Sequence, residues 1–234
     1  MWSAPRNIST AMMRSWENRS DTVVIDEPFY ANYLKVTGID HPMAQEIIDS
    51  GDTDWRSVTA AISQPHASGI FFQKHICTHI LPHIKLDWVN AISNVFLIRD
   101  PHLVVASYAA KREDCVASDL GYALQKNLFD QIQNIGVTKP LVIDSALFID
   151  NPRQQFTILC EQLNIDFEEA MLCWPAGARD TDGVWGKHWY NAVNKSTGFK
   201  KQNTAYPALS EAQQQVAEAC MADYETIKAY AIRH

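Results

Sequence analysis

A short segment near the start of the chain combines residue types that can bind an anion. The segment, SAPRNIST at residues 3–10, follows apolar residues and precedes an amphipathic stretch, so Ser9 and Thr10 stand where a helix would begin. The first turn of a helix offers unpaired N–H groups and a partial positive charge, and Arg6 adds a cation with forked donors. With the two hydroxyls, these groups suit a phosphate or a sulfate. The alternative is an ordinary helix capped by Asn7, with Arg6 on the surface.

Arg99 and Ser107 form a second candidate anion site. Arg99 follows the apolar run 94–98, and Asp100 with Pro101 is a typical helix start. Ser107 would then lie two turns into this helix. If the chain folds back over residues 3–10, Arg99 and Ser107 would face one phosphate. Taken alone, a turn at Arg99 with a buried helical serine is the simpler interpretation.

Taken together, these segments resemble the sulfotransferase family, which uses 3′-phosphoadenosine 5′-phosphosulfate (PAPS) as donor. In that family a strand–loop–helix with a K/R-x-G-[ST]-[ST]-like core holds the 5′-phosphosulfate, and APRNISTAMM occupies that place here. An R-[DN]-P motif with a serine eight residues after the arginine holds the 3′-phosphate, and Arg99 and Ser107 match it. The later stretch DSALFIDNPRQQFTILCEQLNIDF is similar to a structural helix of the family. The matches keep the family's order over residues 3 to about 167.

The resemblance implies a three-layer, P-loop-like α/β fold with a mainly parallel central sheet flanked by helices. It implies sulfuryl transfer from PAPS to a hydroxyl or amine of a small-molecule acceptor. A subgroup that shares PRNIST and a following DEPF has poorly defined acceptors, and some of its members carry aminotransferase-like names that these motifs do not support. The residues implied to bind the donor are Arg6, Asn7, Ser9 and Thr10 around the 5′-phosphosulfate, and Arg99 and Ser107 at the 3′-phosphate.

Two residues of the first segment depart from the family pattern. Arg6 stands where many members have lysine, and its planar fork is not interchangeable with an ammonium. Ile8 stands where many members have glycine. An isoleucine fits there if the position has ordinary helical dihedrals, so we predict a negative φ for Ile8 inside the first helical turn.

Glu27 is the first candidate for the base that takes the acceptor's proton. It follows the apolar run 22–26, so its carboxylate would lie at the strand end that faces the first segment. Asp26 is the adjacent alternative, although alternation along a strand should send the two carboxylates to opposite faces. His75 is the rival base, since small-molecule sulfotransferases carry a K-x-H there, but Lys74 precedes it here without an intervening residue. We favour Glu27 over His75, with a capping or ion-pairing role for Glu27 as the alternative.

A metal site and a late lid are two further hypotheses. His75, His79 and His83 have a spacing that would align on a helix, but Pro82 interrupts it and no carboxylate lies among them, so we predict no metal. Residues 182–203 concentrate cations and aromatic side chains, which suits a lid over the nucleotide or a surface loop with aromatic anchors. The residues that suggest the lid are Trp185, Lys187, His188, Trp189, Tyr190, Lys195, Lys200 and Lys201.

The elements that position these residues follow from the apolar pattern. Short apolar runs separated by helical stretches predict an α/β protein, whose ligands bind beyond the carboxyl ends of the strands. The predicted strands are 1–4, 22–26, 69–74, 94–98 and 140–143. The predicted helices include one from about residue 8, and 29–35, 43–50, 55–63, 101–112, 118–135, 152–163 and 209–232, the last with a capping box at Ser210 and Gln213.

Composition limits the class of protein. With 234 residues, 47% of them hydrophobic, we predict a single sulfotransferase-like domain over residues 1–234. A net charge of −7 argues against nucleic acid and anionic membranes as partners. The start does not resemble a signal peptide, no membrane span is expected, and five scattered cysteines favour a reduced, cytoplasmic protein. The oligomeric state stays open.

Two other functions remain as alternatives. The first is another P-loop phosphoryl-transfer enzyme, which would need a loop lysine and a magnesium-binding aspartate, for which Asp26 is available. The strict GxxxxGK[ST] loop is absent, and so is its lysine. The second is a protein that binds the nucleotide without catalysing transfer.

Overall fold

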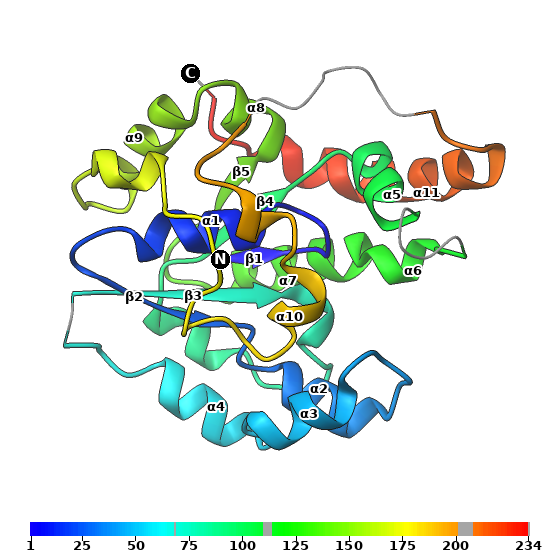
Figure 1. Ribbon diagram of the computed structural model, residues 1–234, viewed down its shortest axis with the longest axis horizontal. Coiled ribbons are helices and arrows are strands. Elements are labelled where there is room, and N and C mark those ends of the chain that lie inside the picture. Colours follow the sequence, from blue (N-terminus) through cyan, green and yellow to red (C-terminus); the bar gives the residue numbers. More distant parts are fainter. Residues whose placement is uncertain (68, 110–113, 201–207, 234) are drawn as a thin grey trace.

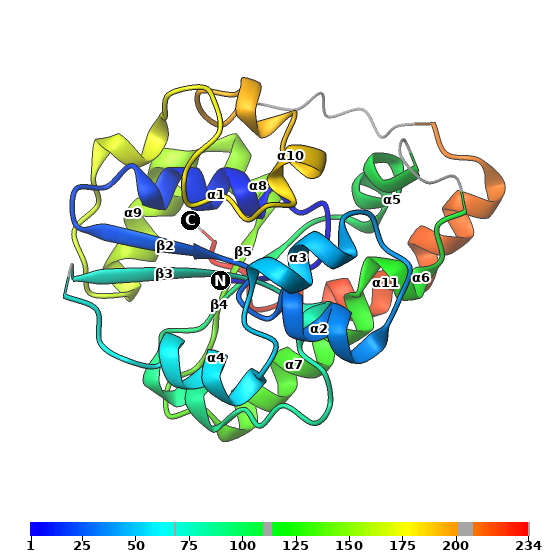
Figure 2. The ribbon, with the colours of Figure 1, turned by 60° about the horizontal axis from the view of Figure 1, so that its bottom comes forward.

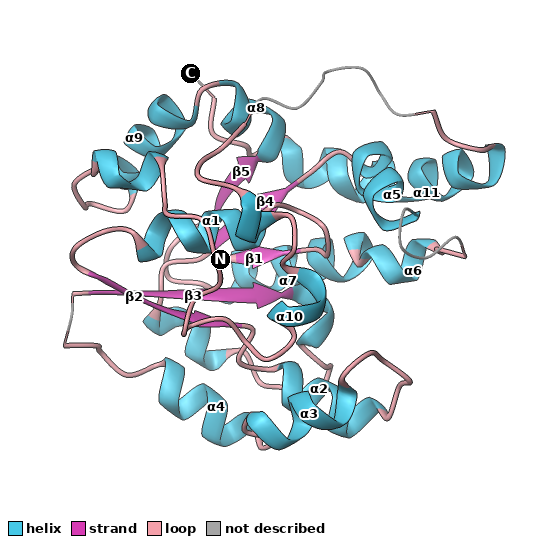
Figure 3. Ribbon diagram, viewed as in Figure 1, coloured by secondary structure: helices cyan, strands magenta, loops and turns pink. Residues whose placement is uncertain are grey.

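The computed structural model of the protein describes residues 1–67, 69–109, 114–200 and 208–233. Strands alternate with helices along the chain (Figure 3), which confirms the predicted α/β class. None of the described helices combines the length and the apolar character that a membrane span requires. The strands are β1 (Trp2–Ser3), β2 (Thr22–Asp26), β3 (Ile70–Ile76), β4 (Val95–Ile98) and β5 (Leu141–Asp144).

The five strands form one parallel sheet in the order β2-β3-β1-β4-β5 (Figure 1). All carboxyl ends therefore meet at one edge. β1 lies at the centre, so the chain leaves it toward β2 and β3 on one side and later returns to β4 and β5 on the other. This is the point at which an open parallel sheet leaves a crevice for a ligand.

Helices cover both faces of the sheet because successive strand residues point to opposite sides (Figure 2). Leu97 packs with α1, α8 and α9, while its neighbours Phe96 and Ile98 pack with α4, α7 and α11. The α-helices are α1 (Ser9–Glu17), α2 (Tyr30–Thr37), α3 (Ala44–Ser50), α4 (Trp55–Ile62), α5 (Pro101–Ala109), α6 (Ala117–Leu120), α7 (Tyr122–Ile135), α8 (Ser145–Asp150), α9 (Pro152–Gln162), α10 (Gly186–Trp189) and α11 (Glu211–Lys228). Short 3-10 helices are η1 (Cys77–His79), η2 (Asp87–Ala91), η3 (Glu169–Leu172) and η4 (Val193–Lys195).

The predicted helix 118–135 is interrupted at Gly121, which separates α6 from α7. Gly121 has a φ of 70°, and a Cβ at this position would lie 2.8 Å from Cγ2 of Thr78 and 3.6 Å from Cδ of Pro5. The break therefore brings the chain against the loop that follows β1. Apolar periodicity alone does not reveal such a close approach.

Two side chains at helix starts add connections at the end of β5. Asp144 accepts hydrogen bonds from the N–H groups of Ala146 and Leu147 and so caps α8, a helix the sequence pattern did not predict. The hydroxyl of Tyr224 in α11 donates to the other oxygen of Asp144 at 2.7 Å. The predicted capping box at the start of α11 is confirmed.

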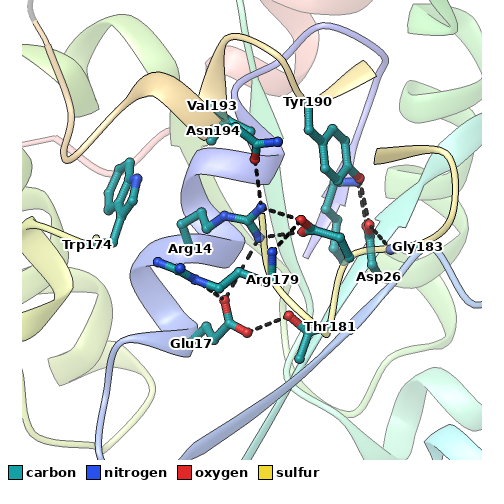
Figure 4. A network of polar contacts seen from close by, with 12 residues as sticks. Arg14, Glu17, Asp26, Trp174, Arg179, Thr181, Gly183, Tyr190, Val193 and Asn194 are labelled. Carbon is teal, nitrogen blue, oxygen red and sulfur yellow. Dashed lines mark hydrogen bonds and ion pairs between the residues drawn. The ribbon is translucent and has the colours of Figure 1, made fainter. Parts of the chain in front are cut away.

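A buried arginine ties residues 174–199 to α1 (Figure 4). Arg14 is 1% exposed, and its guanidinium contacts both carboxylate oxygens of Asp182 at 2.6 and 2.7 Å. It also donates to the side chain of Asn194 at 3.3 Å. At the outer side of this contact, Thr181 donates to Glu17. The late segment is thus attached to the first helix by a charge pair that water scarcely reaches.

We predict that Asp182→Ala lowers the free energy of unfolding by about 3–5 kcal/mol, because Arg14 would keep a buried charge without its counter-ion. Urea unfolding followed by circular dichroism measures this change. Glu225→Gln is the matched control, since Glu225 pairs with Lys228 on an exposed surface and its loss should cost under about 1 kcal/mol. Equal, small effects of the two variants would contradict the structural role of Arg14.

Candidate active site

A large cavity opens at the carboxyl edge of the sheet, with a volume of about 1340 Å³. Its walls come from the loop after β1, the ends of β2 and β3, α2, α5 and residues 185–200. Two parts of this wall differ in chemistry. Contacts group Arg6, Arg99 and Ser107, with the neighbouring Ser9 and Thr10, as a cationic end, and Glu27, Tyr30, Tyr33, His79 and Asp119 as an aromatic end. Asp40 and Lys200 also line the cavity.

The loop after β1 turns sharply before α1 begins. Arg6 has a φ of 62° and Ile8 a φ of 47°, both in the left-handed region that non-glycine residues rarely adopt. Our prediction of a negative φ for Ile8 is therefore wrong: Ile8 lies outside the helix, and α1 starts at Ser9. Left-handed residues cost on the order of 1–2 kcal/mol each and cluster at functional sites, where they turn backbone N–H groups toward an anion.

Asn7 anchors this loop rather than capping the helix. Its side chain is buried, and Nδ2 donates to the carbonyl of Leu97 at the end of β4 at 2.5 Å. The N-cap of α1 is Ile8, which has no capping side chain. Oδ1 of Asn7 has no hydrogen-bond partner among the described residues, although Asn7 lines the cavity. The loop is thus fixed to the centre of the sheet, with one acceptor left over.

The two predicted anion-binding segments meet at the cationic end. Nε of Arg6 donates to Oγ of Ser107 at 3.1 Å, and Arg99 donates to the carbonyl of Arg6 at 2.8 Å. Burial lowers the pKa of both arginines, and the charge of Arg6 lowers that of Arg99 further. No carboxylate pairs with Arg6 in the part of the chain that the structure describes. Two neighbouring, desolvated cations favour an anion of two or more charges between them.

A buried lysine organises the ends of β2 and β3. Nζ of Lys74 lies 2.8 Å from Asp26 Oδ1, contacts Glu27 Oε1 and donates to the hydroxyl oxygen of Tyr190 at 3.0 Å. Tyr190 in turn donates to Asp26 Oδ2 at 2.6 Å and accepts from Trp185 Nε1 at 3.0 Å. Burial lowers the pKa of Lys74, but the two carboxylates outweigh it, so the pKa is raised well above its usual value.

Our expectation that Asp26 and Glu27 point to opposite faces is wrong. Glu27 has a φ of 43°, so the strand pleat ends at Asp26 and the chain turns back. Both carboxylates therefore reach the same ammonium group. Burial and the neighbouring Glu27 raise the pKa of Asp26.

His79 is a cavity residue whose place the sequence analysis missed. Its ring is sandwiched between Tyr30 at 4.2 Å and Tyr33 at 4.8 Å, and its Nδ1 lies 3.6 Å from Glu27 Oε2. Burial, with the nearby charge of Lys74, lowers the pKa of His79 to about 3, so the imidazole is neutral. The 3-10 helix η1, which turns His79 into the cavity, has no clear sequence signature. The one feature of the sequence that could have indicated a cavity residue is the position of His79 shortly after the end of a predicted strand.

His75 lies apart from these residues. Its ring stacks on Trp2 at 4.4 Å within the core, and its Nε2 is 3.2 Å from Gln73 Oε1. Strand alternation explains the difference: Lys74 points toward Asp26 and the cavity, so His75 points to the other face. Burial lowers the pKa of His75 well below its usual value. His83 lies near Trp55, so the three histidines considered for a metal do not converge.

Residues 182–200 of the predicted lid form an ordered wall of the cavity. Trp185 and Tyr190 are buried against α2 and α3, and His188, Trp189 and Lys200 also line the cavity. Lys187 and Lys195 are exposed and do not line it. Lys201 lies outside the described residues. The phosphate-binding role we expected of several lysines is therefore open to Lys200 alone among the described lysines of this segment.

Curated relatives of the chain come from Arabidopsis thaliana. It is 33% identical over 210 residues to branched-chain-amino-acid aminotransferase-like protein 1, and 30% identical over 230 residues to branched-chain-amino-acid aminotransferase-like protein 2. These matches cover 88% and 98% of this chain but 38% and 41% of the relatives. The chain thus spans about two fifths of the length of the curated relatives it matches.

Solved structures show where this fold occurs. The sulfotransferase domain from the Synechococcus PCC 7002 olefin synthase superposes with a TM-score of 0.50 over 99% of this chain and 94% of that one. The sulfotransferase domain from the curacin biosynthetic pathway superposes with a TM-score of 0.51 over 94% and 95%. Both are 15% identical to this chain. At this identity the likeness concerns the fold alone, which is P-loop-like.

The family model of the sulfotransferase domain matches residues 1–231, nearly the whole chain. This match agrees with the order of motifs read from the sequence and with the fold. The chain therefore belongs to the sulfotransferase domain family.

Proposed function

We propose that the protein transfers a sulfuryl group from PAPS to a hydroxyl or amine of a small molecule. One observation carries this proposal: Arg6, Arg99 and Ser107, from segments far apart in the chain, meet in one cavity wall beside the N-terminus of α1. The arrangement supplies two anion-binding positions next to each other. PAPS carries a 5′-phosphosulfate and a 3′-phosphate and so matches both.

The residues of the cationic end fit such a donor. The first N–H groups of α1, Ser9 and Thr10 would hold the 5′-phosphosulfate, while Arg99 and Ser107 would hold the 3′-phosphate. The unpaired Oδ1 of Asn7 would accept a hydrogen bond only from a hydroxyl or amino group of PAPS, since ionised phosphosulfate oxygens carry no hydrogen. Arg6 would stabilise the charge that grows on the bridging oxygen as the sulfuryl group departs.

Glu27 would act as the base. Its carboxylate lines the cavity and is held in place by Lys74. When the acceptor oxygen or nitrogen forms a bond to sulfur, Glu27 takes the proton released from that atom. The donor supplies the sulfuryl group, and adenosine 3′,5′-bisphosphate leaves with the electron pair of the broken S–O bond. His75 has no part in this scheme because it lies in the core.

The alternatives find less support. A P-loop phosphoryl-transfer enzyme would use Asp26 for magnesium, but Asp26 already accepts from Lys74, Tyr190 and the backbone N–H of Gly183. A protein that only binds the nucleotide would have no need for a strained Glu27 aimed into the cavity. We include a cytoplasmic location in the proposal, because all five cysteines are free thiols.

Adenosine 3′,5′-bisphosphate should stabilise the protein, whereas ATP should not. At a concentration about 100 times its Kd, a ligand adds about 2.7 kcal/mol, a rise in Tm of roughly 5–10 °C for a chain of this size. Thermal unfolding with each nucleotide measures the difference. Equal stabilisation by magnesium-ATP would favour the phosphoryl-transfer alternative.

Ser107→Ala should reduce the advantage of adenosine 3′,5′-bisphosphate over adenosine 5′-monophosphate about five- to tenfold, because Ser107 would contact the 3′-phosphate and not the 5′-phosphate. Calorimetric titration of both nucleotides measures it. Ser118→Ala is the matched control, a serine elsewhere in the same cavity wall, and should leave the ratio unchanged. If the ratio of the two affinities is unchanged in Ser107→Ala, the 3′-phosphate does not bind at Ser107.

Lys200→Ala should weaken binding of adenosine 3′,5′-bisphosphate about three- to tenfold, and the loss should shrink at high salt. Lys195→Ala should have no effect, since Lys195 is exposed outside the cavity. Titrations at two salt concentrations compare the two variants. Similar affinities of both variants and the wild type for adenosine 3′,5′-bisphosphate would show that Lys200 does not bind the nucleotide.

Glu27→Gln should lower kcat about 10²- to 10⁴-fold while the affinity for adenosine 3′,5′-bisphosphate stays within about twofold. The amide keeps the size of the side chain but cannot accept the proton. Release of the bisphosphate in the presence of PAPS and an accepted substrate measures kcat, and circular dichroism checks the fold. A variant with near wild-type kcat would exclude Glu27 as the base.

A further inference from the structure

The cavity is larger than one ligand needs. Small-molecule sites usually measure about 300–1,000 Å³, and this cavity measures about 1340 Å³. Glu27 belongs to the aromatic end, where it contacts Lys74 and lies 3.6 Å from His79. With the donor at the cationic end, as proposed above, the aromatic end remains for the acceptor.

The charges of the aromatic end are mainly negative. Among the described lining residues, Glu27, Asp40 and Asp119 carry carboxylates, Lys74 already faces both Glu27 and Asp26, and His41 lies against Tyr30. The arginines of the described cavity wall lie at the other end. An anionic acceptor would meet repulsion here, whereas a cation would be attracted.

The rings of this end suit the same kind of ligand. Tyr30, Tyr33 and Trp185 line the wall, and Tyr33 lies close enough to Asp119 for the carboxylate to raise the pKa of its hydroxyl, after burial as the main cause. A tyrosine face beside a carboxylate attracts an ammonium group both through the ring quadrupole and through the charge. Flat rings also stack on a planar ligand.

A buried polar atom marks the place of the reacting group. Nδ1 of His79 has no hydrogen-bond partner among the described residues, although the side chain is 8% exposed and lines the cavity. Glu27 Oε2, at 3.6 Å, is beyond hydrogen-bond distance. A hydroxyl or amine of a ligand that lies above both atoms would satisfy Nδ1 and present its proton to Glu27.

We propose that the acceptor is a cationic hydroxyl compound, with its hydroxyl at Glu27 and His79 and its ammonium group among the tyrosines near Asp119. The proposal rests on the sulfuryl transfer proposed above and names its acceptor class. The hydroxyl oxygen bonds to sulfur, the S–O bond to the 5′-phosphate breaks, and Glu27 receives the hydroxyl proton. Because the one hydroxyl proton goes to Glu27, Nδ1 of the neutral His79 donates to the hydroxyl oxygen and so orients it.

Three phenols that differ in one charge test the proposal. Tyramine carries an ammonium group, 4-ethylphenol is neutral, and 3-(4-hydroxyphenyl)propanoate carries a carboxylate. Isothermal titration calorimetry, with and without adenosine 3′,5′-bisphosphate, gives the three affinities. Tyramine should bind at least about tenfold more tightly than 4-ethylphenol, as expected for a cation beside rings and a carboxylate, and the carboxylate should bind weakest.

Asp119→Asn separates the charge from the shape of the site. Asp119 accepts from the backbone N–H of Val116, and asparagine keeps an oxygen for this bond. In this variant the affinity for tyramine should fall about three- to tenfold, while the affinity for 4-ethylphenol should stay within about twofold of the wild type. Asp130→Asn is the matched control, because Asp130 pairs with Lys126 on α7 outside the cavity wall, and it should change neither affinity.

Several results would overturn the proposal. These are equal affinities for the three phenols, tightest binding of the carboxylate, no binding of tyramine at millimolar concentration, or an equal loss for tyramine and 4-ethylphenol in Asp119→Asn. The titrations without nucleotide do not depend on the donor. If tyramine is preferred but adenosine 3′,5′-bisphosphate fails to bind, the cation site stands and the proposed donor falls.

Discussion

The buried ammonium group of Lys74 sets constraints on the whole carboxyl edge of the sheet. A buried ammonium group without a counter-ion would lower the stability of the fold by several kcal/mol, so the fold has to place carboxylates beside Lys74. Asp26 reaches it from the paired position on β2, and Glu27 reaches it only because the strand ends there with a positive φ. The hydroxyl of Tyr190 completes the shell. One charge therefore joins β2, β3 and the late segment, which are separated by long stretches of sequence.

The same interaction explains why the candidate base sits on strained backbone. A left-handed glutamate costs on the order of 1–3 kcal/mol and persists when surrounding contacts hold it. Here Lys74 holds the carboxylate, and the Glu27 N–H donates to the carbonyl of Lys74 at 2.9 Å. Tyr190 couples this arrangement to Trp185 and thereby to the aromatic wall. The Oε1 atom of Glu27 is held by the ion pair with Lys74, and Oε2 lies 3.6 Å from Nδ1 of His79.

Sequence patterns predicted the elements well because strands and helices obey local periodicity. β2 has the predicted bounds, and the two segments expected to bind anions meet through a hydrogen bond from Arg6 to Ser107. Apart from the short helix α8, which Asp144 caps locally, the failures lie where tertiary contacts override local rules. Ile8 adopts a left-handed φ because the loop turns between β1 and α1, and Gly121 breaks a helix because Thr78 lies against it. His79 enters the cavity through a 3-10 turn, and its meeting with Glu27 depends on strand order, which periodicity does not encode.

The cavity reverses its charge across a short distance, and this reversal orders the proposed reaction. The cationic end would attract a polyanion and repel an ammonium compound, and the aromatic end would do the opposite, so each ligand would be steered away from the other's place. In the proposed reaction, the hydroxyl proton leaves to Glu27 as negative charge moves toward Arg6. The N-terminus of α1 and Arg6 would stabilise the negative charge that develops on the leaving phosphate. Lys74 would keep Glu27 oriented while Glu27 takes up the proton. A loop without glycine or lysine can thus serve an anion, because backbone geometry at Arg6 and Ile8 supplies what those residues provide elsewhere.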